Sequence, residues 1–160
     1  MALKQKITPY LWFDGTAEQA ANFYVSIFEN SRINAVSRYS EGGHGEPGTV
    51  MVVAFELEGQ KFGAINGGPI FKLSEATSFF IDCETQQEID YFWDKLIEGG
   101  TPQQCGWLKD KFGLSWQIGS ANLIEKVHTS GDNAATGRVM GAMMEMVKID
   151  LDRLKQAYAG

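Results

Sequence analysis

Cysteine and histidine are the side chains of this sequence best suited to nucleophilic or metal chemistry, and there are two of each. Cys105 is the stronger candidate nucleophile, because Lys109 and Lys111 follow it closely and a nearby ammonium favours the reactive thiolate. The alternative is that Cys105 is a small, half-buried residue without chemistry. Cys83 ends a predicted strand, and we expect it to be inert in the core or at a sheet edge. The spacing of these residues predicts neither a Ser-His-Asp nor a Cys-His arrangement.

The two histidines, His44 and His128, are far apart, and neither has a cysteine or a second histidine near it. We expect surface or loop roles for them, the alternative being that His44 and Glu46 reach a ligand. Residues 43–48 match G-x-G-x-x-G by letter, but Pro47 interrupts the run and a strand is predicted after it. Phosphate-binding loops of this pattern open a helix instead. Residues 43–48 are therefore predicted to be a mobile loop, which can act as a lid over a cavity.

The clearest binding pattern consists of aromatic, hydroxyl and amide side chains that alternate along predicted strands. Successive side chains of a strand point to opposite faces, so the predicted strand at 7–13 places three of them together: Thr8, Tyr10 and Trp12. Predicted strands at 77–83 and 114–118 place four more on the corresponding face: Ser78, Phe80, Ser115 and Gln117. Rings with a few polar groups are typical of a small-molecule site rather than of acid–base catalysis. The alternative is that the rings simply fill the core.

The elements that must position these residues occur twice along the chain at a constant offset. Asp14 corresponds to Asp82, and Asn22-Phe23-Tyr24 corresponds to Asp90-Tyr91-Phe92. Each copy reads as a short apolar strand, a polar turn, an amphipathic helix, and then two or three further strands. This order predicts the α+β class and two fused modules of one domain. A cleft between such modules is a natural place for a small ligand.

The turns into the two predicted helices contain acidic residues. We expect Asp14 and Asp82 to act as caps that the helix dipole favours, the alternative being general bases. Thr16 is predicted to cap the first helix, with Gln19 three residues later completing a capping box.

The chain after Gly119 has helical periodicity and no counterpart in the first module, so 120–160 is predicted to be a C-terminal helical extension. Its main apolar stripe is rich in methionine and consists of Met140, Met143, Met144 and Val147. Such a stripe is expected to fill the core. The alternative is a surface for self-association, since methionine is favoured at adaptable interfaces.

Composition excludes several classes of function. The chain has 160 residues, which favours one compact domain, and its net charge is −6 without a cluster of Lys and Arg. Nucleic acids and anionic membranes bind basic patches, so neither is expected as a partner. There is no apolar run of about 20 residues that would span a membrane. The N-terminal residues predict no signal peptide, and two unpatterned cysteines favour the cytoplasm.

Several segments together resemble the vicinal-oxygen-chelate superfamily, the glyoxalase and bleomycin-resistance group. They are most similar to its PhnB-like branch, also called 3-demethylubiquinone-9 3-methyltransferase-like. The resemblance covers residues 5–119 and is carried by the segments at 7–15, 22–24, 66–69 and 112–118. It implies paired βαβββ modules, at about 5–70 and 75–119, that curve around a shared cavity within a core of residues 1–119.

The resemblance also implies where a metal would bind. In metal-dependent members, four inward-facing positions of the modules hold a divalent ion, and in this chain they fall at Thr8, Asn66, Ala76 and Gln117. Only Gln117 is a plausible ligand there. We therefore predict no fixed metal and no cofactor. A true methyltransferase is not expected either, because no glycine-rich strand-to-helix turn is present to seat a nucleotide-like methyl donor.

We therefore expect a cytoplasmic, homodimeric PhnB-like protein that binds a small, partly aromatic molecule in a sheet-lined cavity. Tyr10 and Trp12 would stack on the ligand, and Asn66, Ser78 and Gln117 would orient it. Three alternatives stay open: a lyase, isomerase or dioxygenase of the glyoxalase type with a loosely bound metal, a protein that sequesters an antibiotic, and a thiol-dependent activity at Cys105.

Overall fold

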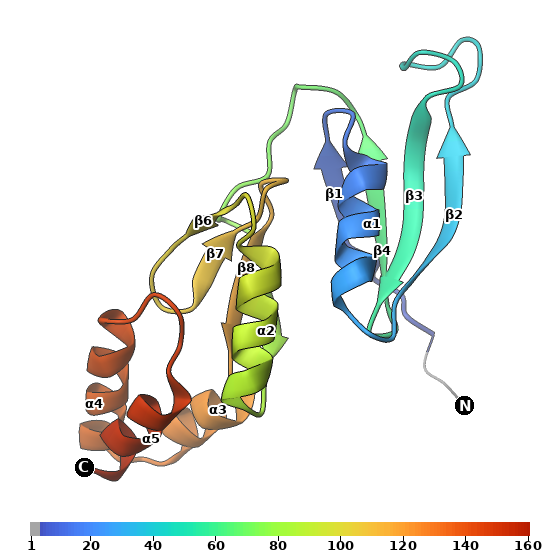
Figure 1. The fold of residues 1–160 in the computed structure, drawn as a ribbon. Helices are drawn as coiled ribbons and strands as arrows, with labels where there is room; N and C mark the ends of the chain where they lie inside the picture. Colours follow the sequence, from blue (N-terminus) through green and yellow to red (C-terminus); the bar gives the residue numbers. More distant parts are fainter. Residues whose placement is uncertain (1–3) are drawn as a thin grey trace. The chain divides into compact units, whose positions relative to one another are not determined.

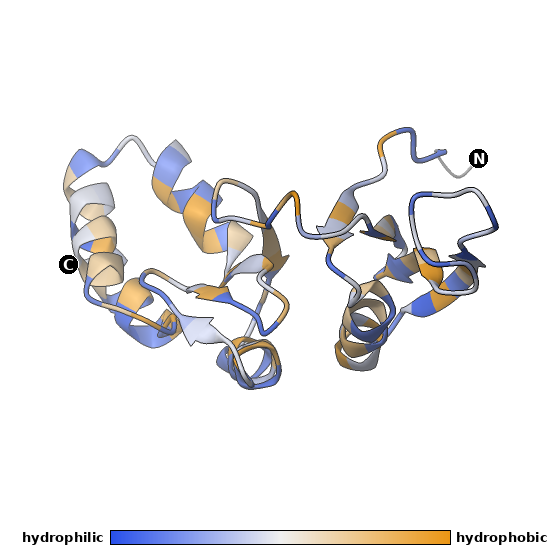
Figure 2. Cartoon of the chain, turned by 90° about the horizontal axis from the view of Figure 1, so that it is seen from above, coloured by the Kyte–Doolittle hydropathy of each residue, from blue (hydrophilic) through white to orange (hydrophobic). Residues whose placement is uncertain are grey.

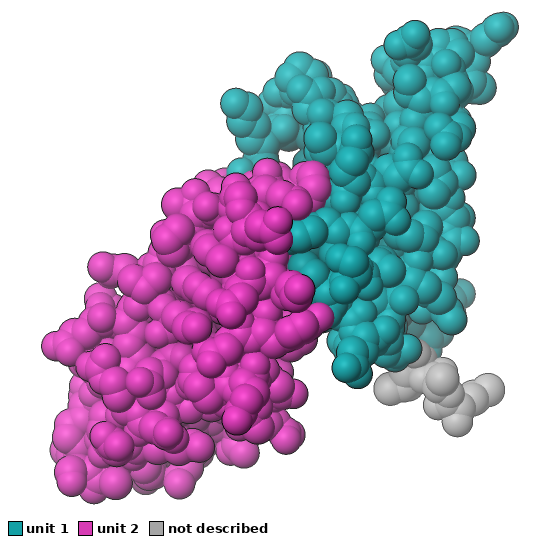
Figure 3. Space-filling view, in the orientation of Figure 1, with its two compact units in different colours: residues 1–73 teal, residues 74–160 magenta. Residues whose placement is uncertain are grey.

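The structure is a computed structural model that describes residues 4–160; residues 1–3, where no signal peptide is predicted, lie outside the described residues. The chain forms two compact units, residues 1–73 and residues 74–160 (Figure 3). Within the described part of the chain, no helix is long and apolar enough to cross a bilayer.

The first unit is a four-stranded sheet with one helix. In chain order its elements are β1 (Tyr10–Phe13), α1 (Ala17–Ile27), β2 (Arg32–Arg38), β3 (Val50–Leu57) and β4 (Gln60–Asn66). The strands lie in the order β1-β4-β3-β2. The β1 and β4 strands are parallel, whereas the β4-β3 and β3-β2 pairs are antiparallel. Glu58 and Gly59 join β3 to β4 with positive φ angles of 48° and 77°, as a type I′ hairpin turn requires.

Strand alternation divides the first sheet into a covered face and an open face. Leu11, Phe13 and Phe55 are buried on the covered face, where α1 packs with Tyr24 fully inaccessible (Figure 1). Tyr24 and Phe55 stack with ring centroids 6.3 Å apart. Tyr10 is on the open face and is 63% exposed.

The second unit repeats this arrangement. Its elements are β5 (Ser78–Asp82), α2 (Gln86–Leu96), β6 (Thr101–Pro102), β7 (Trp107–Lys109) and β8 (Ser115–Gly119). The strand order is β5-β8-β7-β6, again with the first strand parallel to the last. The paired βαβββ modules and the α+β class predicted from the sequence are thus confirmed.

Three helices follow the second sheet in the same compact unit: α3 (Ala121–Thr129), α4 (Asn133–Met144) and α5 (Leu151–Ala159). They lie together, coloured orange to red in Figure 1. Each begins at a residue whose side chain accepts a hydrogen bond from the helix backbone: Ser120, Asp132 and Asp150. Hydrophobic and hydrophilic residues alternate around the helices (Figure 2), as expected for amphipathic helices with one buried side.

Several predicted details are wrong. Thr16 makes no side-chain hydrogen bond to α1; instead, the side-chain oxygen of Asn66 accepts from the Ala17 amide at 2.9 Å. The α2 helix has the full capping box, formed by Thr85 and Glu88. Asp82 does not cap α2, because its carboxylate accepts from the Ala121 amide at the start of α3.

Two strand boundaries also differ from the prediction. The first strand begins at Tyr10, so Thr8 precedes it and is exposed. The apolar pattern also predicts a short strand at 105–108; in the structure this strand is β7 (Trp107–Lys109), and Cys105 lies in the preceding turn with a φ of 59°. A positive φ is incompatible with strand geometry, which the apolar pattern alone did not reveal.

Candidate functional site

An apolar pocket lies in the second unit between its sheet and the C-terminal helices. Its volume is about 310 Å³. The sheet contributes Phe80, Trp107 and Gln117 to its lining, and the helices contribute mainly aliphatic and methionine side chains, among them Leu123, Val127, Val139, Met140, Met143, Met144 and Leu154. Ligand pockets of proteins have about 300–1,000 Å³, so this one suits a compact molecule of one or two rings.

The sheet wall of the pocket is a row of three side chains across three strands. Gln117 is the register partner of Phe80 on β5 and of Trp107 on β7. Directly paired residues of neighbouring strands point to the same face, with Cβ atoms about 5 Å apart. The central amide is therefore flanked by an aromatic side chain on each side.

A hydrogen bond within the sheet orients the side-chain amide of Gln117. Its Nε2 donates a 2.7 Å hydrogen bond to Oγ of Ser78, two residues before Phe80 on β5. This bond directs the amide along the sheet and sets where its carbonyl oxygen lies. Ser78 and Gln117, which the sequence predicted as binding residues, are thus brought together, with Ser78 acting on the other side chain.

The helical wall is formed by flexible side chains. Met140, Met143 and Met144 occupy one side of α4 and all line the pocket. The prediction that the methionine stripe fills the core is wrong for three of its four residues, because Met140 is 41% exposed, Met144 58% and Val147 47%. Unbranched thioether side chains adapt to ligands of irregular shape.

Cys105 and His128 add the more reactive polar groups to the lining. The Cys105 thiol is partly exposed and donates to the sulfur of Met144 at 3.6 Å. Cys83 contrasts with it, because burial raises the pKa of the Cys83 thiol to about 12. Cys105 is therefore the thiol available to a ligand. Of the two places expected for Cys83, the core or a sheet edge, the structure shows the core.

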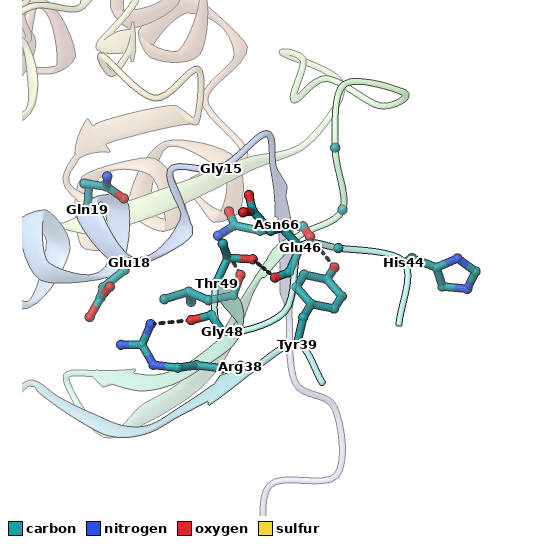
Figure 4. Close-up of a pocket in the computed structure, with 14 residues that line it drawn as sticks. Gly15, Glu18, Gln19, Arg38, Tyr39, His44, Glu46, Gly48, Thr49 and Asn66 are labelled. Atoms are coloured by element: carbon teal, nitrogen blue, oxygen red, sulfur yellow. Dashed lines mark hydrogen bonds between the residues drawn. The ribbon is translucent and has the colours of Figure 1, made fainter. Parts of the chain in front are cut away.

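A second, polar pocket of about 630 Å³ lies in the first unit (Figure 4). Its wall includes Asn66, Arg38 and the loop at 44–48. The Arg38 guanidinium donates to the Gly48 carbonyl at 3.1 Å, and the Tyr39 hydroxyl donates to the Asn66 carbonyl at 2.6 Å. These bonds hold the loop against the strand ends.

The glycine-rich segment at 43–48 connects β2 to β3, as predicted, and no helix follows it directly. Gly45 packs against the ring of Tyr39, where an added Cβ would lie 2.3 Å from the ring. The imidazole of His44 lies apart from the labelled side chains of Arg38 and Glu18 (Figure 4). The phosphate-binding interpretation thus has no structural support.

A family model described as 3-demethylubiquinone-9 3-methyltransferase matches residues 5–119. The chain belongs to this family. A solved structure from Bacillus cereus, described as a PhnB protein and putative 3-demethylubiquinone-9 3-methyltransferase, is 42% identical to this chain. The match covers 73% of this chain and 100% of that one, with a TM-score of 0.67. The resemblance seen in the sequence is confirmed. No curated protein matches the chain.

More distant structures share the fold alone. Protein PA1353 from Pseudomonas aeruginosa is 18% identical, with a TM-score of 0.62, over 73% of this chain and 98% of that one. The fosfomycin resistance protein FosX from Listeria monocytogenes is 11% identical, with a TM-score of 0.55, over 78% of this chain and 97% of that one. The matches agree with the vicinal-oxygen-chelate fold.

The predicted binding residues of this PhnB-family chain lie in both units. Thr8, Tyr10, Trp12 and Asn66 belong to the first unit, and Ser78, Cys105 and Gln117 belong to the second. Tyr10 lies over Gly63 and Trp12 over Gly67, because an added Cβ at either glycine would collide with the ring. Trp12 also donates from Nε1 to the Gly68 carbonyl at 2.9 Å. Both rings therefore pack on the backbone of the first unit.

The four positions that bind metal in other superfamily members carry few free ligands here. The side chain of Asn66 is bonded to the Ala17 amide and to the Val50 carbonyl. Ala76 has no donor atom, and Thr8 precedes β1. Among residues 4–160, no three His, Cys, Asp or Glu side chains are grouped so that they could hold a metal ion. The absence of a metal at these positions stays a prediction.

Sequence reasoning missed Trp107 and the helical wall of the pocket. Trp107 lies in a predicted strand, but its register against Gln117 depends on the turn at Asp110. The Asp110 carboxylate accepts from the amides of Phe112 and Leu114, and from Nε1 of Trp116. The methionine stripe was the sequence signal for the helical wall. It would have predicted that wall if the methionines had been interpreted as pocket residues rather than as core residues.

Proposed function

We propose that this PhnB-family protein binds a small, partly aromatic molecule in the pocket of its second unit, without a fixed metal at the four positions that bind one in other superfamily members. The observation that carries the proposal is the row of Phe80, Gln117 and Trp107 across the sheet. A planar ligand would lie against the two rings, and the oriented amide would bind a polar group at its centre. Aromatic contacts of this kind contribute about 0.5–1.5 kcal/mol beyond burial.

The lining favours an apolar ligand with one or two polar groups. Most of the lining side chains are aliphatic, aromatic or methionine, and the side chains that can hydrogen bond are those of Trp107, Cys105, Gln117, Ser120 and His128. The side-chain oxygen of half-buried Gln117 would lose its contact with water under a ligand, so ligands that cannot donate to it are disfavoured. Ligands with a carbonyl, hydroxyl or amine on a ring system should therefore bind more tightly than plain hydrocarbons of the same size.

The name of the family refers to methyl transfer, but the fold supports binding rather than that reaction. In the described residues, strands lead directly into helices at 14–16, at 83–85 and at Ser120, and none of these connections is a glycine-rich turn. A nucleotide-like methyl donor needs backbone amides presented at such a turn. If the protein is an enzyme, we propose chemistry of the glyoxalase or dioxygenase type instead.

Methionine methyl groups provide a direct test of the binding proposal. In protein labelled with ¹³C at the methionine methyls, aromatic compounds of one or two rings should shift the signals of Met140, Met143 and Met144. Met51 on β3 in the first unit serves as the internal control. The Gln117→Leu variant should weaken binding of the compound by about 10-fold, because it removes one hydrogen bond between uncharged groups. A compound panel that shifts Met51 and leaves the α4 signals unmoved would refute the proposal.

We also propose that the protein is a cytoplasmic homodimer. Exposed apolar side chains support self-association: Tyr10, Ile70 and Phe71 in the first unit, and Met144 and Val147 in the second. Monomeric proteins rarely leave large apolar patches open to water. Light scattering coupled to gel filtration should give twice the chain mass, and a monomer at micromolar concentration would contradict this proposal.

A further inference from the structure

Two sulfur atoms from distant parts of the chain meet at the edge of the apolar pocket. Sγ of Cys105, in the turn before β7, lies 3.6 Å from Sδ of Met144, at the end of α4. Two sulfur ligands at about 2.3 Å from one metal ion are about 3.8 Å apart in tetrahedral coordination and about 4.0 Å apart in trigonal coordination. The observed separation therefore matches a pair of sulfur atoms that could share an ion after a small adjustment.

The backbone holds Cys105 in this position. Its φ of 59° is an unfavourable conformation for a residue with a Cβ, and such outliers persist where the surroundings fix them. The amide of Cys105 donates to the Met146 carbonyl, and the next amide, of Gly106, donates to the Val147 carbonyl, both at 2.8 Å. The cysteine is therefore bonded directly to the segment that follows Met144, so the two sulfurs are positioned together.

Gly106 allows this close approach. A Cβ added there would lie 2.7 Å from the Ile118 carbonyl oxygen and 2.7 Å from Cγ1 of Ile149. With a φ of +80° as well, the position accepts glycine alone without strain. The sequence Cys105-Gly106 thus brings the thiol against α4 in a way that a bulkier second residue would prevent.

Further soft donors line the same pocket. Met140 and Met143 lie on the side of α4 that carries Met144, and His128 is in the last turn of α3. Thiolate, thioether and imidazole are ligands that Cu(I) accepts, whereas magnesium, calcium and manganese prefer oxygen. Among residues 4–160, no cluster of three His, Cys, Asp or Glu side chains offers a competing site for harder metals.

We propose that Cys105 and Met144 form a binding site for a soft monovalent metal ion, Cu(I), with a third ligand from Met140, Met143 or His128. On binding, the Cys105 thiol loses its proton to water, the sulfur–copper bond forms, and copper keeps its oxidation state. The net charge of −6 favours a cation over an anion near the protein. The site goes beyond the binding of an aromatic molecule, because it uses the rim of the pocket, where Met144 is 58% exposed.

The test is anaerobic titration of the reduced protein with Cu(I) in competition with bathocuproine disulfonate, whose copper complex is read by absorbance. The wild type should bind one ion per chain. Loss of a residue that only supports a metal ligand weakens metal binding by about 10–100-fold. Cys105 would be a direct ligand, so Cys105→Ser should weaken Cu(I) binding by at least about 100-fold. Met144→Leu should weaken it by roughly 10-fold, since a neutral thioether binds less strongly than a thiolate. Met51→Leu is the matched control and should leave the affinity unchanged.

A second measurement uses the unaltered protein and so does not depend on the folding of variants. Silver(I), a diamagnetic soft ion, should shift the ¹³C-methyl signal of Met144 and leave that of Met51 in place. Equal affinity of the wild type and Cys105→Ser for Cu(I), or equal shifts at Met144 and Met51, would overturn the metal site. Aromatic compounds are titrated separately without metal, so either proposal can fail while the other holds.

Discussion

The role of Asn66 in the first unit leads to a sharp prediction about stability. Its Oδ1 accepts from the Ala17 amide at 2.9 Å, and its Nδ2 donates to the Val50 carbonyl at 3.1 Å. Asn66→Ala leaves both backbone groups without these partners at a half-buried position. The loss of the helix cap contributes about 1 kcal/mol. The second hydrogen bond contributes about 1 kcal/mol as well, so the free energy of unfolding should fall by about 2 kcal/mol.

The measurement must report on the first unit alone. Trp12 is the single tryptophan of residues 1–73, so ¹⁹F spectra of protein labelled with 5-fluorotryptophan follow that unit through one signal. During urea unfolding, the midpoint of the Trp12 transition should fall by about 1 M in Asn66→Ala, given slopes of 1–3 kcal/mol per molar. Asn66→Asp keeps the acceptor for α1 and loses only the donor to Val50, so it should cost about 1 kcal/mol.

Asn22→Ala is the matched control for the same substitution on the exposed side of α1. The amide of Asn22 bonds only to the Glu18 carbonyl of its own helix. Surface changes of this kind usually stay within about 0.5 kcal/mol. If Asn66→Ala were as stable as Asn22→Ala, the assignment of Asn66 as the cap of α1 would be refuted.

Three further predictions concern caps, a buried hydroxyl and the thiols. Thr85→Ala should lower the free energy of unfolding by about 1 kcal/mol, as read from the urea midpoint, whereas Thr16→Ala should change it by less than about 0.5 kcal/mol, since only Thr85 caps its helix. Equal effects would contradict this. Ser115→Ala should stabilise the protein by about 1 kcal/mol in the same assay, because Oγ of this fully buried serine has no hydrogen-bond partner; a loss of stability would show that the hydroxyl is bonded. Iodoacetamide at pH 8 should label Cys105, whereas Cys83, whose pKa burial raises to about 12, should react only after unfolding or at strongly alkaline pH. Peptide mass spectrometry reads both thiols, and rapid labelling of Cys83 in the folded protein would contradict its burial.

Most of the fold could be predicted from local patterns. The two copies of strand, turn and helix were visible because their aromatic and acidic residues recur at one offset. Helix ends were harder to predict, since Thr16 and Thr85 look equivalent in sequence and only Thr85 caps its helix. The difference comes from Asn66, whose side chain reaches the start of α1 from the last strand, and no local pattern contains that information.

The candidate site was predicted in part. Alternation along β5 and β8 identified Ser78, Phe80 and Gln117 because these strands are regular. Trp107 and the α4 methionines were missed, because their place depends on a turn and on helix packing rather than on periodicity. Cys105 was singled out for its lysine neighbours, yet the structure pairs Lys109 with Glu75, so that ammonium is committed elsewhere.

The caps of α1 and α2 have a consequence for the order of folding. Everything that caps α2 lies within the four residues Thr85 to Glu88, so this helix can start as soon as its own segment has been synthesised. The cap of α1 comes from 49 residues further along the chain. Contacts between distant residues form late, because a long loop must close first. The N-terminal helix therefore leaves the ribosome before the residue that completes it, and it can become stable only when the last strand of its sheet has docked.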